Sequence, residues 1–196
     1  LVMRLEVSRG DYARFASASR RGRADCRDPR SLGLFRNPSW ADPGFEQDES
    51  HPVVCVSHQD ALAYAAWLSE RTGKPYRLPS RSEWRALAGP PGIPRSACSQ
   101  GNVLDQSVRR DLANNPRFGC NDGFPYTAPG GRFPVSEVGL HDLYGNVSEW
   151  VADCAQGGGG RGREYLYLGT SWRDGERRGD RLLQGSLEAD RGLTTV

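Results

Sequence analysis

Three stretches of the chain space their apolar residues like one face of a helix. Each stretch follows a serine that can cap a helix, at Ser8, Ser57 and Ser80. Asp60 and Glu83 stand three residues after the second and third of these serines, which is the spacing of a capping box. The pattern therefore predicts three helices. The apolar positions that mark them are Tyr12 and Phe15, then Ala61, Leu62, Ala65 and Leu68, then Trp84 and Leu87.

Short apolar stretches with a weaker, alternating pattern predict strands at Leu1–Val7, His51–Val56 and Glu164–Leu168. Between these elements, residues 20–50 are polar and interrupted by prolines. Residues 92–139 show no periodicity and are rich in Asn, Asp, Gly and Pro. Because long ordered loops in compact domains usually serve a function or are pinned, we expect metal ions or disulfides to hold these segments.

Composition agrees with an irregular domain. The 196 residues contain 24 glycines and 13 prolines, and 37% are hydrophobic, which predicts a single, loop-rich α+β domain spanning residues 1–196. The formal net charge of +2 does not indicate nucleic-acid binding. No apolar run approaches the roughly 20 residues that a membrane span needs, and no signal peptide is visible. Because the chain opens at Leu1 inside a predicted strand, we expect it to be part of a larger polypeptide.

The chain has five cysteines, and no two of them form a C-x-x-C pair, which argues against zinc-ribbon and thioredoxin-type sites. An odd number permits at most two internal bridges and leaves one thiol. Their loop-like surroundings favour disulfides, and hence a secreted or periplasmic location, over free core thiols. The cysteines are Cys26, Cys55, Cys98, Cys120 and Cys154.

A series of short motifs occurs in a fixed order along nearly the whole chain. They are Asn37-Pro38-Ser39-Trp40, His51-Pro52-Val53-Val54, Arg77-Leu78-Pro79-Ser80, Asn121-Asp122-Gly123-Phe124, Thr127-Ala128-Pro129, the run from Gly139 to Trp150, and Gly169-Thr170-Ser171-Trp172-Arg173. The ordered set resembles the formylglycine-generating-enzyme, or sulfatase-modifying-factor, family. The resemblance implies a mixed, loop-rich C-type-lectin-like fold, with the family's first and last strands outside residues 1–196.

The resemblance also implies two calcium sites, built from the oxygen ligands that calcium prefers. One would use the side chains of Asp142 and Glu149 and the carbonyls of Gly145 and Val147. The other would use the side chains of Asn102 and Asp122 and the carbonyls of Val103 and Phe124. The segment between Asn102 and Asp122 is longer than the family pattern, and a Cys98–Cys120 bridge would close it. Cys26 and Cys55 are the further disulfide candidates.

The family's oxidase chemistry needs two cysteine thiolates that bind copper, shortly after the Gly169–Trp172 motif. At those two positions this chain has Asp174 and Gly179, and no cysteine follows Cys154. We therefore expect no copper and no formylglycine generation by that mechanism.

Two functions from different classes remain open. The first is a non-catalytic ligand-binding or sensory module that uses the surface around Trp172, Arg173 and Asp174 to bind a small molecule, peptide or protein. The second is a metal-dependent oxidative tailoring enzyme, of the siderophore-maturation or sulfoxide-synthase type. The three histidines, His51, His58 and His141, show no metal-triad spacing that would favour the second.

Overall fold

The computed structural model describes residues 2–22, 24–27, 38–89, 96–108, 116–155, 163–175 and 184–193. Regular structure accounts for only a part of these ranges. The helices are α1 (Arg9–Ser19), α2 (His58–Thr72), α3 (Arg81–Ala88) and the short α4 (Ala97–Gln100). The strands are β1 (Asp25–Arg27), β2 (Glu149–Cys154), β3 (Glu164–Leu168), β4 (Gln184–Glu188) and β5 (Arg191–Leu193). The architecture is the loop-rich α+β arrangement that the sequence predicts.

All three predicted helices form, because each begins at a local capping interaction. Ser8 accepts a hydrogen bond from the backbone N–H of Asp11 at the start of α1. Ser57 and Ser80 form complete capping boxes with Asp60 and Glu83. In α2 the buried face differs from the expected one.

In α2, Leu62 is 44% exposed, whereas Tyr64 lies in the core at 7%. The inner face of α2 also carries polar groups, because Asp60 is buried beside Arg21 and forms an ion pair with it. Ala61 and Leu68 do pack against the core, so the spacing predicts the helix and part of its inner face but wrongly includes Leu62.

Strands form two separate sheets. One is an antiparallel sheet in the order β2-β3-β4, and the other is a parallel pair of β1 and β5. The strand predicted at Glu164–Leu168 is confirmed as β3. The strand predictions at Leu1–Val7 and His51–Val56 are wrong in the described residues. The two segments meet at an isolated bridge between Ser8 and Pro52, with one bond from Val53 N–H to the carbonyl of Val7 and one from Arg9 N–H to the carbonyl of His51.

The physical reason lies in the partners of these two extended segments. The backbone N–H of His141 bonds to the carbonyl of Arg4, and that of Cys55 bonds to the carbonyl of Leu193. Because the hydrogen bonds go to several different segments, no continuous ladder develops between any two of them.

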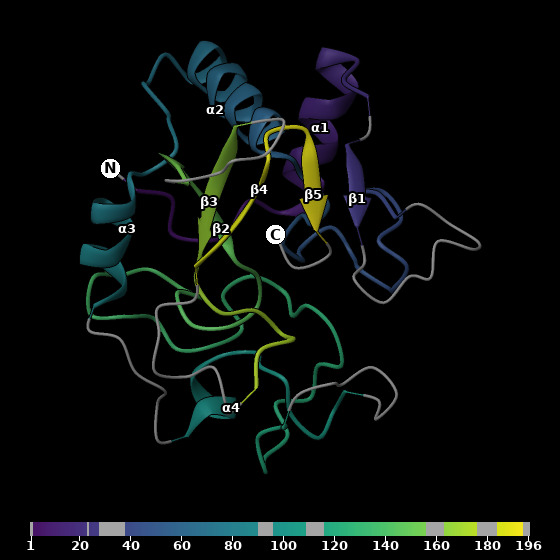
Figure 1. Ribbon diagram of the computed structural model, residues 1–196, viewed down its shortest axis with the longest axis vertical. Helices are drawn as coiled ribbons and strands as arrows, with labels where there is room; N and C mark the ends of the chain where they lie inside the picture. The colour runs from purple at the N-terminus through teal and green to yellow at the C-terminus, as the bar shows by residue number, and fades with distance from the viewer. Residues whose placement is uncertain are drawn as a thin grey trace.

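The core is divided into clusters. An aromatic cluster joins α1 to α2 through Tyr12, Phe15 and Tyr64, with edge-to-face contacts at centroid distances of 5.3 and 5.5 Å. A second cluster packs Trp84 of α3 against the β2-β3 sheet. Helices α1, α2 and α3 and the two sheets occupy one half of the molecule, and irregular loops around the short helix α4 occupy the other (Figure 1). The loop half therefore depends on contacts other than regular secondary structure.

Two disulfides connect the loops. Cys98 and Cys120 form the predicted bridge, and Cys26 pairs with Cys55, while Cys154 is free and exposed.

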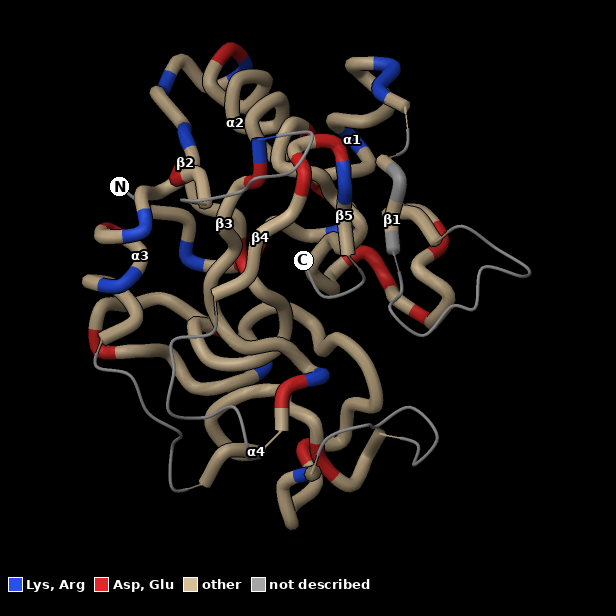
Figure 2. The backbone as a smooth tube through the Cα atoms, viewed as in Figure 1, with Lys and Arg blue, Asp and Glu red and all other residues tan. Residues whose placement is uncertain are grey.

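Acidic and basic residues are interspersed along the backbone (Figure 2). None of the helices in the described ranges combines the length and apolarity that crossing a membrane requires.

Candidate functional site

The two loops that carry the predicted metal ligands interlock. The backbone N–H of Asn146 bonds to the carbonyl of Asn102 at 2.8 Å, and the side-chain amide of Asn102 bonds to Oδ1 of Asn146 at 3.1 Å. Both asparagines are fully buried. The crossing is tight: a Cβ on Gly145 would lie 2.3 Å from the carbonyl oxygen of Asn102, and one on Gly101 would lie 1.9 Å from that of Tyr144. The two loops therefore form one structural unit.

The loop from Asp142 to Glu149 presents two acidic side chains to the interior. Asp142 is 5% exposed, and its Oδ2 accepts a hydrogen bond from the N–H of Gly131 at 2.7 Å. Within the described residues its buried Oδ1 has no partner. Glu149 accepts a hydrogen bond from the indole N–H of Trp84. Burial raises the pKa of both Asp142 and Glu149, so their charged forms are costly without compensation.

The carbonyl ligands predicted in this loop belong to Gly145 and Val147, one residue on either side of Asn146. The backbone there adopts positive φ at Asp142, Gly145 and Asn146, with values of 57°, 85° and 60°. Gly145 donates its N–H to the hydroxyl of Thr170 at 2.7 Å. The loop is thus a succession of tight turns, the geometry in which neighbouring oxygens can converge.

A third carboxylate, which the motif analysis did not assign, joins this loop. Glu6 accepts hydrogen bonds from the side-chain amide of Asn146 at 2.7 Å and from the N–H of Val147 at 3.2 Å. Burial, followed by the charges of Asp142 and Glu149, raises the pKa of Glu6 well above its usual value. The available signal was a single carboxylate between Leu5 and Val7 in a mostly apolar segment. Three acidic groups therefore share one low-dielectric region.

In the second loop, Asp122 is held by the backbone. Its two carboxylate oxygens accept hydrogen bonds from the N–H groups of Val103 at 2.9 Å and Phe124 at 2.8 Å. Burial raises the pKa of Asp122 to about 6. Asn102 has an unpartnered, buried Oδ1 among the described residues. The carbonyl of Phe124 accepts a hydrogen bond from the hydroxyl of Ser107 at 2.9 Å.

Asp105 is a second acidic residue of this loop that sequence reasoning missed. It is fully buried and accepts hydrogen bonds from the N–H of Asp122 and from the N–H of Ser107, the latter at 2.7 Å. The segment containing it departs in length from the family pattern, so no motif marked it. The Cys98–Cys120 bridge closes the same segment, as predicted.

Only part of the predicted ligand surface is accessible to solvent. Trp172 is 1% exposed, and its ring packs at centroid distances of 5.7 Å from Phe45 and 5.3 Å from Tyr126. Its side chain therefore supports the surface from beneath and does not present a face for direct contact. Arg173 lies over the Trp172 ring at 5.3 Å, and Asp174 accepts hydrogen bonds from the N–H and hydroxyl of Ser171, both at 2.8 Å. Gly179 lies outside the described residues.

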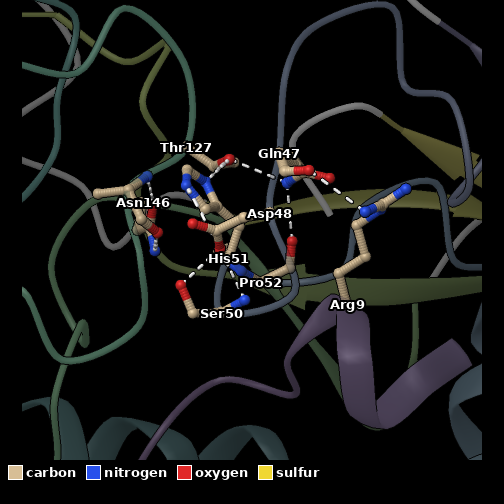
Figure 3. Close-up of polar contacts among 9 residues, drawn as sticks. Arg9, Gln47, Asp48, Ser50, His51, Pro52, Thr127 and Asn146 are labelled. Carbon is tan, nitrogen blue, oxygen red and sulfur yellow. Dashed lines mark hydrogen bonds and ion pairs between the residues drawn. The ribbon is translucent and has the colours of Figure 1, made fainter. Parts of the chain in front are cut away.

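A polar network fixes the loop that precedes α2. The ring of His51 contacts the hydroxyl of Thr127 at 2.9 Å, and the amide of Gln47 donates to the same hydroxyl at 2.9 Å (Figure 3). The guanidinium of Arg9 reaches the carbonyl of Gln47 at 3.2 Å. The next residue, Ala128, donates its N–H to Oδ1 of Asn146 at 2.8 Å. The network thus links α1 to the interlocked loops.

The three histidines occupy separate structural positions. His51 contacts Thr127, His58 contacts the carbonyl of Val151 at 3.1 Å, and His141 contacts the carbonyl of Phe133 at 3.1 Å. In the described ranges, the one group of potential metal ligands with close mutual spacing contains no histidine. This distribution offers no histidine-based redox centre in that part of the chain.

Comparison with known proteins agrees with these loops and motifs. The family description "Sulfatase-modifying factor enzyme 1-like domain" matches residues 1–189. The chain belongs to this family. It is 34% identical over 126 residues to the formylglycine-generating enzyme of Mus musculus, covering 61% of this chain and 32% of that protein. It is 33% identical over 150 residues to the inactive C-alpha-formylglycine-generating enzyme 2 of Bos taurus, covering 74% and 46%.

The chain therefore spans less than half the length of these two curated relatives. A third, the serine/threonine-protein kinase Pkn1 of Chlamydia trachomatis, is 33% identical over 114 residues, which are 57% of this chain but 15% of the kinase. Family members thus include a region of a much larger protein and a member whose name states that it is inactive.

Solved structures share the fold of this sulfatase-modifying-factor-like chain. PvdO from Pseudomonas aeruginosa superposes with a TM-score of 0.72 and 27% identity, covering 96% of this chain and 75% of that one. CarF superposes with a TM-score of 0.64 at 22% identity, covering 98% and 82%. The predicted fold class and family are confirmed.

Proposed function

We propose that this chain is a non-catalytic ligand-binding or sensory module whose interlocked loops are braced by calcium. The observation that supports this most directly is the state of Asp174, which occupies a position where the family's oxidase chemistry needs a cysteine. Its carboxylate is engaged by Ser171 and supplies no thiolate. No cysteine follows Cys154 in the sequence. Copper binding by the family's two-thiolate mechanism has no ligands here.

The donor set of the loops supports calcium as the bracing ion. Calcium takes six to eight oxygen ligands from carboxylates, amide side chains and backbone carbonyls. Asp142 and Asn102 each keep one buried oxygen without a partner among the described residues. A buried acceptor in that condition costs about 1–3 kcal/mol, which a bound cation would offset.

Charge supports the same assignment. Burial raises the pKa of Glu6, Asp142 and Glu149, and the charge of Asp142 further raises those of Glu6 and Glu149, so a divalent cation would relieve both effects. In this proposal Asp142, Glu149 and the carbonyls of Gly145 and Val147 hold one ion. The side chains of Asn102 and Asp122 and the carbonyls of Val103 and Phe124 hold the other.

The ligand would bind on the surface around Arg173 and Asp174, with Trp172 beneath it. Arg173 combines a cation with a planar group that an aromatic ring supports, which suits contact with a small molecule, peptide or protein. The kinase relative, of which only 15% is matched, supports a role as one module of a larger polypeptide. Two disulfides support a secreted or periplasmic location.

Metal analysis and a chelation experiment test this function. Purified protein should contain calcium, and EGTA should lower its melting temperature. The variant Asp142→Ala, which removes the side-chain oxygens, should lose most of that response, whereas Glu137→Ala, at an exposed acidic position outside both proposed ligand sets, should keep it. An unchanged melting temperature with and without calcium would contradict the calcium bracing.

A second candidate is an oxidative tailoring enzyme of the same family. The observation that favours it is the likeness to PvdO, which extends over 96% of this chain at 27% identity. Stoichiometric iron or copper in the purified protein, together with oxygen consumption during an aerobic substrate screen, would select this candidate over the binding module. Calcium alone would select the binding module.

A further inference from the structure

The disulfide Cys98–Cys120 lies directly against two buried carboxylates. Sγ of Cys98 is 3.3 Å from Oδ2 of Asp105. One ligand atom each of Cys98, Asp105 and Asp122 lies within 4.8 Å of the other two. While the disulfide is intact, the sulfur has no charge and is no metal ligand. Once the bond is reduced, Cys98 carries a thiol, and its thiolate form can bind a metal ion.

We propose that reduction of Cys98–Cys120 converts this cluster into a zinc site, with Cys98, Asp105 and Asp122 as the protein ligands and a water molecule as the fourth. Zinc takes four ligands in a tetrahedron, with Zn–S distances near 2.3 Å and Zn–O distances near 2.0 Å. Those bonds separate a sulfur from an oxygen by about 3.5 Å. The separation of 3.3 Å between Cys98 and Asp105 is close to this value.

The two carboxylates are already oriented by donors. Asp105 accepts from the N–H groups of Ser107 and Asp122, and Asp122 accepts from those of Val103 and Phe124. Oδ1 of Asp105 accepts from both the N–H and the hydroxyl of Ser107, whereas Oδ2, the oxygen that faces Cys98, accepts only the N–H of Asp122 and keeps a lone pair for a metal. Supporting hydrogen bonds of this kind hold ligands in place and commonly change metal affinity 10–100-fold. The two carboxylate ligands are therefore already positioned before a metal ion binds.

Reduction of the disulfide comes first, and metal binding follows. A dithiol donates two electrons and two protons to the Cys98–Cys120 bond, which breaks into two thiols, while the dithiol closes to a disulfide. Zinc then replaces the proton of the Cys98 thiol, which goes to solvent, while Cys120 stays a thiol. Thiolates select zinc over calcium, which prefers oxygen ligands. Because Asp122 is shared, reduction would exchange calcium for zinc in this loop and leave the proposed Asp142–Glu149 site unaffected.

A matched pair of variants tests the site without any reductant. Both carry Cys154→Ser. Cys120→Ser frees the Cys98 thiol, and Cys98→Ser frees the Cys120 thiol, while the Cys26–Cys55 bond stays intact in both. Cobalt serves as the spectroscopic substitute for zinc. The Cys120→Ser protein should show a sulfur-to-cobalt charge-transfer band and should bind zinc at least about tenfold more tightly than the Cys98→Ser protein.

Adding Asp105→Asn to the Cys120→Ser protein should weaken zinc binding by about tenfold or more. If removing the bridge loosens the fold, zinc should restore the near-ultraviolet circular dichroism of the Cys120→Ser protein only. Equal zinc affinity in the two variants, no sulfur-to-cobalt band, or zinc that restores neither fold would overturn the proposal. Calcium binding measured in Asp142→Ala and in its parent tests the proposed function separately, because no thiolate contributes to that loop.

Discussion

The carboxylate of Glu6 accepts a 2.7 Å hydrogen bond from the side-chain amide of Asn146, 140 positions further along the chain. Asn146 in turn bonds to Asn102, Ala128 and, through its carbonyl, the N–H of Trp172. One buried asparagine therefore connects the N-terminal segment, both candidate metal loops and the proposed ligand surface. Substitutions around it should affect several parts of the molecule together.

Glu6→Ala should destabilise the folded state. The change leaves the N–H of Val147 without its acceptor and removes one of the two partners of the Asn146 amide. Leaving a buried donor unsatisfied costs about 1–3 kcal/mol, so we expect the free energy of unfolding in urea to fall by about 2 kcal/mol. Glu137→Ala, at an exposed position, is the control. Equal stability of the two variants would show that the Glu6 contacts contribute nothing.

Gly145→Ala should be far more damaging than Gly139→Ala. Both glycines have positive φ, 85° and 81°, and an alanine in that region costs about 1–2 kcal/mol. A Cβ at Gly139 meets no atom within 4 Å, whereas one at Gly145 meets the carbonyl of Asn102 at 2.3 Å. Gly139→Ala should lower the free energy of unfolding by about 1–2 kcal/mol. Gly145→Ala should additionally abolish calcium-dependent stabilisation, measured by thermal melts with and without EGTA.

Acidification should destabilise the protein through His58. Its Nε2 contacts the carbonyl of Val151, and its buried Nδ1 has no partner in the described ranges, so a second proton there would be unsatisfied. Burial lowers the pKa of His58 below its usual value near 6.5, so the unfolded chain takes up the proton first. The contribution of His58 to stability is thus complete above about pH 6.5 and falls as pH drops towards the lowered pKa. Asp122, whose pKa is raised to about 6, contributes in the opposite direction on acidification.

His58→Phe should flatten this pH dependence. Phenylalanine keeps a ring against Tyr165, which stacks on His58 at 3.7 Å, but it cannot titrate. It also deprives the Val151 carbonyl of its donor, which should cost about 1 kcal/mol at pH 7.5. The measurement is the urea unfolding free energy between pH 5 and pH 7.5. Parallel pH profiles for the two proteins would refute the assignment to His58.

Trp172→Ala should destabilise the protein more than Arg173→Ala, because Trp172 supports the proposed ligand surface from beneath and Arg173 lies on that surface. Trp172 fills the space beside Phe45 and Tyr126, and loss of a buried aromatic ring costs about 3–5 kcal/mol. Arg173 is only partly buried, and loss of its contact with the ring costs about 0.5–1 kcal/mol. Thermal melts measure both effects. A small change in Trp172→Ala would indicate that the ring is not part of the core.

Features set by neighbouring residues could be predicted from the sequence. The capping boxes Ser57–Asp60 and Ser80–Glu83 each span three positions, so the helices they begin were correctly located. The Cys98–Cys120 bridge was also anticipated, since it closes a segment marked by its unusual length. The parallel pair of β1 and β5 was not, because strands joined from opposite ends of the chain leave no local pattern.

Residue types and their order along the chain by themselves determined the helix starts, the family, and the absence of any cysteine after Cys154. Only the tertiary structure decided that Glu6 joins the Asp142 loop, that Asp105 lies buried beside Cys98, and that Trp172 is covered. Each of these depends on segments that meet through long-range packing. Burial and carboxylate proximity arise from that convergence, and short-range periodicity does not encode them.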